Sequence, residues 1–141
     1  MDIISIVLSG IAILLSVFSF VFQVIHNRRE STLNAFNDLQ EQSLDKLYKY
    51  TPKKIEEIAQ NFRSEEYKDI SVLLARIEHF CVGVNLKIYD KNVVRRLGGS
   101  YIISTYNKMV PMIEVKRKMF PADKHYDEFE KLATALRNSI Q

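Results

Sequence analysis

The sequence has a single cysteine, Cys81, so it cannot form an intrachain disulfide, which agrees with a reducing compartment. Its three histidines, His26, His79 and His125, are far apart, and none has metal-ligand spacing to another histidine or to Cys81. The chain also lacks a phosphate-binding loop, a nucleophile elbow and the Arg–His spacing of helical nucleases. These absences predict a protein that is not an enzyme and that holds no metal or cofactor.

Charged residues are missing from the first part of the chain. The 23 consecutive uncharged residues from Ile3 to Ile25 correspond to about 35 Å of helix, enough to cross a hydrocarbon core of ~30 Å. A signal peptide would begin with positive charge and end at a small-residue cleavage site, whereas only Asp2 precedes this stretch and bulky residues end it. A buried core helix of this length would dominate so small a domain. The pattern predicts an uncleaved transmembrane helix.

Positive charge is confined to the chain beyond this stretch, where Arg28 and Arg29 follow it closely. By the positive-inside rule, the N-terminus faces out and residues 26–141 lie in the cytoplasm, as in an inner-membrane protein. This segment carries all 20 basic residues and 16 of the 17 acids, since Asp2 lies before it, so its net charge is +4. So mild a bias does not indicate a nucleic-acid-binding protein, and no DNA partner is expected.

Helical spacing of apolar residues dominates the remaining sequence, and strand-like alternation is scarce. We expect the membrane helix to continue as a juxtamembrane stalk until Thr51-Pro52, where the proline begins the next helix. The predicted fold is all-α, with a single transmembrane helix over residues 1–27, a stalk over residues 28–51, and a cytoplasmic bundle of five or six helices over residues 52–141.

Capping and breaking residues divide this bundle into helices. Ser64 is the predicted N-cap of the helix with the broadest apolar face, which we expect to form the centre of the core. Asp90 and Asp123 are predicted to cap later helices, Gly98-Gly99 to end a short helix, and Pro111 to kink or break the next one. The residues of the central helix that we expect to be buried together are Leu74, Ile77, Phe80 and Val84.

The second half of the chain carries three short motifs. They are Gly-Val-x-x-x-Ile-Tyr-Asp at residues 83–90, Val-Arg-Arg at residues 94–96 and Gly-Ser-Tyr-Ile at residues 99–102. In these motifs the sequence resembles a family of small bacterial and prophage proteins catalogued as a domain of unknown function, DUF4760. The resemblance implies a bacterial source and one N-terminal span followed by a helical domain, and it implies no activity.

The small and polar residues of the predicted span form a stripe. Their spacing alternates between four and three, which places them on one face of a helix, and the series continues through His26 and Glu30. In lipid, small residues allow helices to approach and polar groups bond across the interface, so the stripe predicts self-association. A dimer or trimer would bury it as packing, whereas a larger ring would line a wet pore with it. This polar stripe comprises Ser5, Ser9, Ala12, Ser16, Ser19 and Gln23.

Basic residues cluster further along the chain. Between Lys91 and Lys118 there are seven basic residues and one acid, Glu114, and two of the arginines precede a Gly-Gly turn and a predicted helix start, where backbone N–H groups hold anions. A helix C-cap at Gly98 and a solvated charged face account for the same residues without a ligand. The candidate anion-binding residues are Arg95, Arg96, Gly99, Ser100, Lys116, Arg117 and Lys118.

Two functions fit this sequence. The first is a membrane protein that self-assembles through its span, and small membrane proteins of this shape resemble the pore-forming or membrane-perturbing effectors of bacterial antiphage defence. The second is a membrane-tethered scaffold whose helical domain docks a protein or a phosphate-bearing ligand. The expected partners are the lipid membrane and further copies of the chain, with the protein or anionic ligand as the alternative.

A reporter fused after Gln141 tests the orientation. We expect the fusion to behave as cytoplasmic and the N-terminus to stay unprocessed, because Arg28 and Arg29 flank the span and no cleavage site follows it. Alkaline phosphatase activity from this fusion in intact cells would show that the topology is reversed.

Overall fold

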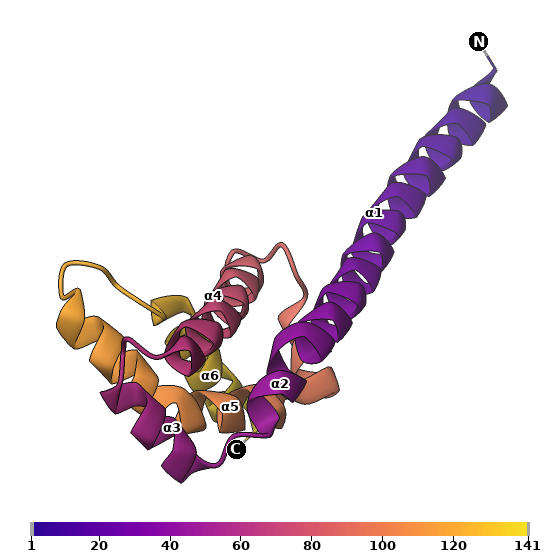
Figure 1. The fold of residues 1–141 in the computed structure, drawn as a ribbon. Coiled ribbons are helices and arrows are strands. Elements are labelled where there is room, and N and C mark those ends of the chain that lie inside the picture. The colour runs from indigo at the N-terminus through magenta and orange to yellow at the C-terminus, as the bar shows by residue number, and fades with distance from the viewer. Residues whose placement is uncertain (1, 141) are drawn as a thin grey trace.

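The computed structural model describes residues 2–140, and all regular structure within them is helical. Figure 1 shows a long helix, α1, projecting from a domain formed by the other helices. The elements are α1 (Ile3–Leu39), the π-helical turn η1 (Gln40–Leu44), α2 (Asp45–Tyr48), α3 (Pro52–Gln60), α4 (Glu65–Asn85), α5 (Lys91–Met119) and α6 (Asp127–Ile140). The predicted all-α fold is confirmed.

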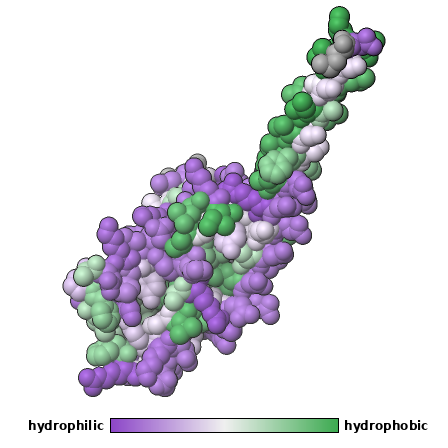
Figure 2. Space-filling model, turned by 90° about the horizontal axis from the view of Figure 1, so that it is seen from above, coloured by the Kyte–Doolittle hydropathy of each residue, from purple (hydrophilic) through white to green (hydrophobic). Residues whose placement is uncertain are grey.

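The first part of α1 extends away from the domain. It is long and apolar enough to cross a membrane, and none of its side chains is buried. In Figure 2 it is a largely hydrophobic (green) rod that projects from a mostly hydrophilic (purple) domain. Exposure of so much contiguous apolar surface to water is unfavourable. This part of α1 therefore requires an apolar environment that the rest of the described chain does not provide.

Side-chain caps begin three helices where the sequence predicts them. The side chains of Thr51, Ser64 and Asp90 each accept a backbone N–H two or three residues further on, at 2.9 to 3.2 Å. Pro52 is the first residue of α3, where its missing N–H has no cost. These caps satisfy donors that the first turn of a helix leaves without partners.

Helix α4 lies at the centre of the core, in contact with α1, α3 and α6. The ring of Phe80 meets Phe36 of α1 edge-on with centroids 6.1 Å apart, and it stacks on Tyr89 with centroids 5.4 Å apart. Gly83 makes room for the Tyr89 ring, because a Cβ at this position would lie 2.6 Å from Cε2 of the tyrosine. The prediction of the central helix is confirmed by the burial of Leu74, Ile77, Phe80 and Val84.

The segment over residues 28–51 continues the apolar helix, as predicted, but it is part of the helical domain rather than a stalk outside it. Helix α1 runs without a break from the apolar stretch to Leu39, and the chain continues through η1 and α2. Four of its apolar residues lie on the face that packs against α4 and α5, while Leu33 and Tyr48 are exposed. Its buried members Phe36, Leu39, Leu44 and Leu47 belong to the same core as α4. The helical domain thus begins within α1.

Of the two predicted breaks in this part of the chain, the one at Gly98 is confirmed, and at Pro111 the helix does not break. The backbone leaves helical geometry at Gly98, so α5 consists of a short helix and a longer one joined by a kink at this residue. A Cβ at Gly98 would lie 2.5 Å from Cζ of Phe36, so the glycine allows α1 to approach α5 closely. The helix also continues through Pro111 to Met119, because burial of neighbouring side chains such as Met112 offsets the loss of one backbone N–H.

Helix α6 begins at Asp127, and the prediction of a cap at Asp123 is wrong. The first N–H groups of α6 are instead accepted by the carboxylate of Glu78, which belongs to α4. Because Glu78 lies about 50 residues earlier in the chain, no local sequence pattern reveals this cap.

Substitution of Phe80 by alanine tests the assignment of the core. Phe80 is buried and contacts two other aromatic rings, so Phe80→Ala should lower the free energy of unfolding by about 3–5 kcal/mol. Denaturant melting of the full chain in detergent, followed by circular dichroism, measures the change. Phe62→Ala is the matched control, because Phe62 is exposed and its loss should change stability by less than about 0.5 kcal/mol. Equal effects of the two substitutions would contradict this core.

Candidate functional site

The polar stripe lies along α1 and is exposed over its whole length. The Ser9 hydroxyl donates to the carbonyl of Ser5 at 2.8 Å, and the Ser16 hydroxyl donates to the carbonyl of Ala12 at 2.9 Å. These bonds satisfy both hydroxyl donors within the helix, while each hydroxyl oxygen keeps acceptor capacity for a neighbouring helix. The structure therefore presents Ser5, Ser9, Ala12, Ser16, Ser19 and Gln23 as one accessible face.

The domain packs on the other face of α1. At about 100° per residue, the polar stripe stays within about 40° of Ser5, whereas Thr32, Phe36 and Leu39 lie about 140–180° away. These three residues are buried against the domain. Because α1 is one unbroken helix, the domain lies on the side of α1 opposite the polar stripe.

Three contacts fasten α1 to the turn between α4 and α5, just beyond the apolar stretch. The Arg28 Nη2 group donates to the carbonyl of Tyr89 at 3.1 Å. The N–H of Asp90 donates to Thr32 Oγ1 at 2.8 Å, and the Asp90 carboxylate lies 3.8 Å from Arg29 Nε. We call these five residues the α1 clamp. Sequence reasoning used the two arginines only for topology and missed the clamp, because its partners are about 60 residues apart.

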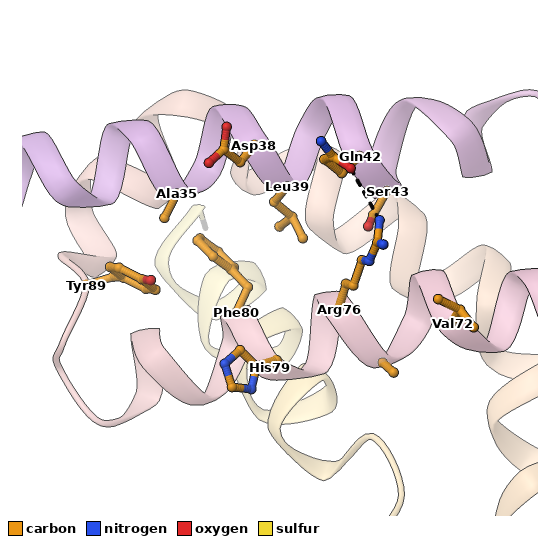
Figure 3. A pocket seen from close by; sticks show the side chains of 11 residues that line it. Ala35, Asp38, Leu39, Gln42, Ser43, Val72, Arg76, His79, Phe80 and Tyr89 are labelled. Atoms are coloured by element: carbon orange, nitrogen blue, oxygen red, sulfur yellow. Dashed lines mark hydrogen bonds between the residues drawn. The ribbon is translucent and has the colours of Figure 1, made fainter.

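A groove opens between α4 and the α1–η1 segment, with Tyr89 of the clamp at one end (Figure 3). It has a volume of about 730 Å³, and Leu39 and Phe80 form part of its apolar floor. Exposed polar side chains lie along its sides, and Arg76 Nη1 of α4 donates to Gln42 Oε1 of η1 at 3.4 Å. The other polar residues that line the groove are Asp38, Ser43 and His79.

Ser43 is the buried polar residue of this groove. Its side chain is fully buried, and its Oγ has no hydrogen-bond partner among residues 2–140. An unpartnered buried hydroxyl costs about 1–3 kcal/mol. Because no part of Ser43 is exposed, a molecule in the groove would reach this hydroxyl only if η1 opened locally. Ser43 belongs to the π-helical turn η1, and such turns are frequent at functional sites. The arrangement is suited to binding a molecule with both apolar and polar groups.

The candidate anion-binding residues are not brought together. A Cβ at Gly99 would lie 3.7 Å from Ile140 and 3.8 Å from Leu136, so α6 covers this position. Ser100 and Lys116 are 16 residues apart along α5, which corresponds to about 24 Å. The structure thus separates the group Arg95, Arg96, Gly99 and Ser100 from the group Lys116, Arg117 and Lys118.

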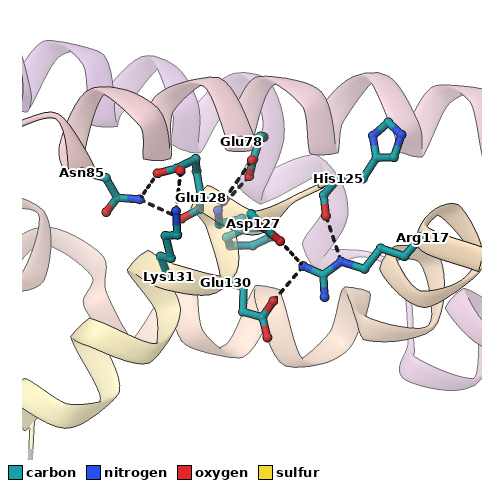
Figure 4. Close-up of polar contacts among 9 residues, drawn as sticks. Glu78, Asn85, Arg117, His125, Asp127, Glu128, Glu130 and Lys131 are labelled. Carbon is teal, nitrogen blue, oxygen red and sulfur yellow. Dashed lines mark hydrogen bonds and ion pairs between the residues drawn. The ribbon is translucent and has the colours of Figure 1, made fainter. Parts of the chain in front are cut away.

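Within the second group, Arg117 already has partners in the fold (Figure 4). Its Nη2 lies 2.7 Å from Glu130 Oε2 and 3.3 Å from Asp127 Oδ1, and its Nε donates to the carbonyl of His125 at 2.9 Å. Two carboxylates from the start of α6 therefore compensate its charge. Arg117 joins the end of α5 to the start of α6 and has little capacity left for an anion.

Glu78 holds the start of α6 from the side of α4 (Figure 4). Its Oε1 accepts the N–H of Glu128 at 3.0 Å, and its Oε2 accepts the N–H of Phe129 at 2.7 Å. Burial raises the pKa of the Glu78 carboxyl, and the two backbone hydrogen bonds oppose this rise without cancelling it. No local pattern in the sequence singles out Glu78, and its capping role becomes visible only in the fold.

The remaining reactive residue types stay apart. Residues 2–140 contain no group of three His, Cys, Asp or Glu side chains placed to hold a metal ion. His26 lies on α1, His79 on α4 and His125 in the segment before α6. Cys81 is fully buried in α4, and burial raises the pKa of its thiol well above the ordinary value, which makes it unreactive.

The pH dependence of stability tests the environment of Glu78. Because its pKa is raised, the folded chain holds this proton to a higher pH than the unfolded chain. Its contribution to stability is therefore complete below the unfolded pKa and declines as the pH rises through the folded pKa. Since Glu78→Gln removes this titration, the Tm of the wild type relative to the variant should be higher at about pH 4 than at about pH 7.

Thermal melting of both full chains in detergent measures this difference. Glu57→Gln, which changes an exposed carboxyl of α3, controls for the substitution itself. A wild-type advantage that grows toward neutral pH would mean that the two amide hydrogen bonds outweigh burial.

Comparison with known proteins assigns the chain to a family. No curated protein and no solved structure matches it. The family model for a domain of unknown function, DUF4760, matches residues 6–136. This range includes most of α1, the whole α1 clamp and most of α6. Because the match covers nearly the whole chain, the resemblance seen in residues 83–102 is confirmed, and the protein belongs to the DUF4760 family.

Proposed function

We propose that this is a single-pass protein of the bacterial inner membrane that self-assembles through the polar stripe of α1, with its helical domain in the cytoplasm. The observation that carries the proposal is that the stripe and the domain lie on opposite faces of one unbroken helix. Stripes from several copies therefore meet at a common axis while their domains point outward. The domain neither covers the stripe nor obstructs a partner helix.

Continuity of α1 favours a permanent membrane span over a removable signal peptide. The residues that pack α1 on the domain, such as Thr32 and Phe36, belong to the same helix as the apolar stretch. Cleavage directly after the apolar stretch would cut a helix whose second part belongs to the core. It would separate the α1 clamp from the apolar part of α1. Arg28 and Arg29 at the end of the stretch favour a cytoplasmic domain.

The chemistry of the stripe suits association in lipid. The rest of the apolar stretch consists mainly of Ile, Leu, Val and Phe, which lipid chains solvate well. Serine and alanine on the stripe allow two helices to approach closely, and the hydroxyl and Gln23 amide groups bond across the contact. His26 and Glu30 extend the same face beyond the apolar stretch and are exposed.

The assembly takes one of two forms. In a dimer or trimer the stripe is fully used in packing, and the protein joins cytoplasmic domains at the membrane. In a larger ring the stripe lines an aqueous pore, and assembly would make the membrane permeable, as expected of an effector in antiphage defence. Ion flux distinguishes the two forms.

Paired substitutions in the stripe test the proposal. Replacing Ser9 and Ser16 with leucine places branched side chains on the contact and should separate the helices, whereas replacing both with alanine keeps the close approach. We expect the leucine pair to abolish oligomers in crosslinking and size analysis in nanodiscs, and the alanine pair to retain them. Val7 and Leu14, which lie about 160–180° around α1 from Ser5 and are exposed, provide the control: replacing both with alanine should leave assembly unchanged.

Ion flux across the membrane of liposomes that contain the same variants distinguishes the pore-lining ring from the tightly packed dimer or trimer. If the stripe lines a pore, the alanine pair should reduce flux while oligomers persist, because an apolar constriction excludes water. In the packing form, no variant conducts, and neither does the wild type.

The groove beside α4 favours a second candidate function, a membrane-tethered protein that docks a ligand or partner protein. The supporting observation is a groove of about 730 Å³ that combines an apolar floor with the exposed side chains of Arg76 and His79. In this interpretation α1 is only a tether. Normal assembly of the leucine pair would rule out the polar stripe as an interface and leave this second function.

A further inference from the structure

The turn between α4 and α5 exposes two large apolar side chains. Leu86 is 67% exposed and Ile88 is 61% exposed, and Lys87 between them adopts a left-handed conformation with φ of 62°. The backbone N–H of each of these three residues donates to a carbonyl of α4 at 2.9 to 3.0 Å. The turn is therefore well ordered by hydrogen bonds, and it holds both apolar side chains on the surface.

The α1 clamp fixes this turn beside the end of the apolar stretch (Figure 1). Tyr89, the residue after Ile88, accepts the hydrogen bond from Arg28 at 3.1 Å. Arg28 is three residues beyond Ile25, which corresponds to about 4.5 Å along the helix. The headgroup zone on each side of a bilayer is about 5–7 Å thick. An α1 that crosses the bilayer thus places the turn at the depth of the lipid headgroups.

Basic side chains surround the apolar pair. Lys87 and Lys91 are exposed, and the Arg29 side chain is 64% exposed. The acid of this segment, Asp90, is engaged by Arg29 and by the cap of α5. Large apolar side chains with lysine or arginine beside them are typical of segments that lie in the membrane interface, where the apolar part enters the lipid and the charges meet headgroup phosphates.

We infer that Leu86 and Ile88 insert into the cytoplasmic leaflet and that the domain rests on the bilayer that α1 crosses. This inference depends on the proposed function, because it requires α1 to span the membrane. The occupant of the apolar pair is the lipid of that same bilayer. With two attachments, the span and the turn, the tilt of α1 is restricted, and the Tyr89 end of the groove lies next to the membrane.

Single tryptophans test the inference cleanly, because the chain contains no native tryptophan. The full-length variant Leu86→Trp is placed in nanodiscs whose lipids carry bromine on the acyl chain near the headgroup, and the loss of tryptophan emission is measured against unbrominated lipid. Leu14→Trp, in the middle of the apolar stretch, reports whether α1 crosses the bilayer. Ile88→Trp repeats the measurement at the neighbouring exposed position of the turn.

Tyr48→Trp is the matched control for the affinity of tryptophan itself for lipid. Tyr48 is 75% exposed and lies at the end of α2, 20 residues beyond Arg28, which corresponds to about 30 Å along the helical segment. A tryptophan there is on the same tethered domain but away from the bilayer, so its emission should be unchanged by brominated lipid.

The expected result is quenched and blue-shifted emission from Leu86→Trp and Ile88→Trp, strong quenching of Leu14→Trp by bromine placed near the chain ends, and no quenching of Tyr48→Trp. Turn variants that behave like Tyr48→Trp while Leu14→Trp is quenched would overturn the inference and leave the span intact. An unquenched Leu14→Trp would overturn both the span and the inference.

Discussion

The structure depends on how α1 is fastened at the end of its apolar stretch. Arg28 and Thr32 bond to the backbone of Tyr89 and Asp90, and the Asp90 carboxylate also caps α5. One short turn therefore joins the rod of α1, the end of α4 and the start of α5. Charge-assisted bonds and a threonine that receives an N–H at 2.8 Å make this a defined contact rather than a flexible linker.

These contacts fix the orientation of the apolar part of α1 relative to the helical domain. Because α1 is unbroken, the packing of Thr32 and Phe36 on the domain also fixes the direction in which the polar stripe points. The stripe faces away from the domain. The same contact holds Leu86 and Ile88 beside the apolar stretch. The proposed assembly and the inferred membrane contact thus both depend on one geometric constraint. The groove between α4 and the α1–η1 segment begins at Tyr89, a residue of the clamp.

The sequence predicted those features of the fold that depend on residues close together in the chain. The start of α3 at Pro52, the caps at Ser64 and Asp90 and the apolar face of α4 could be found because each depends on residues within a few turns. The features that were missed depend on distant partners. Glu78 caps α6 from another helix, Phe36 fills the space that Gly98 leaves, and Arg117 is bound to α6. Of the candidate site residues, the polar stripe could be placed on one face from its spacing alone, whereas the groove and the clamp need the fold.

Disulfide crosslinking between copies in the membrane tests most directly whether the protein self-assembles through the polar stripe. Ser16 lies on the polar stripe, and Leu14 lies about 180° around α1 from Ser5. The native Cys81 is fully buried, so single cysteines at these two positions report on α1 alone. Self-assembly through the polar stripe predicts that Ser16→Cys forms covalent dimers under mild oxidation and that Leu14→Cys does not. Equal crosslinking at both positions, or crosslinking only at Leu14→Cys, would contradict it.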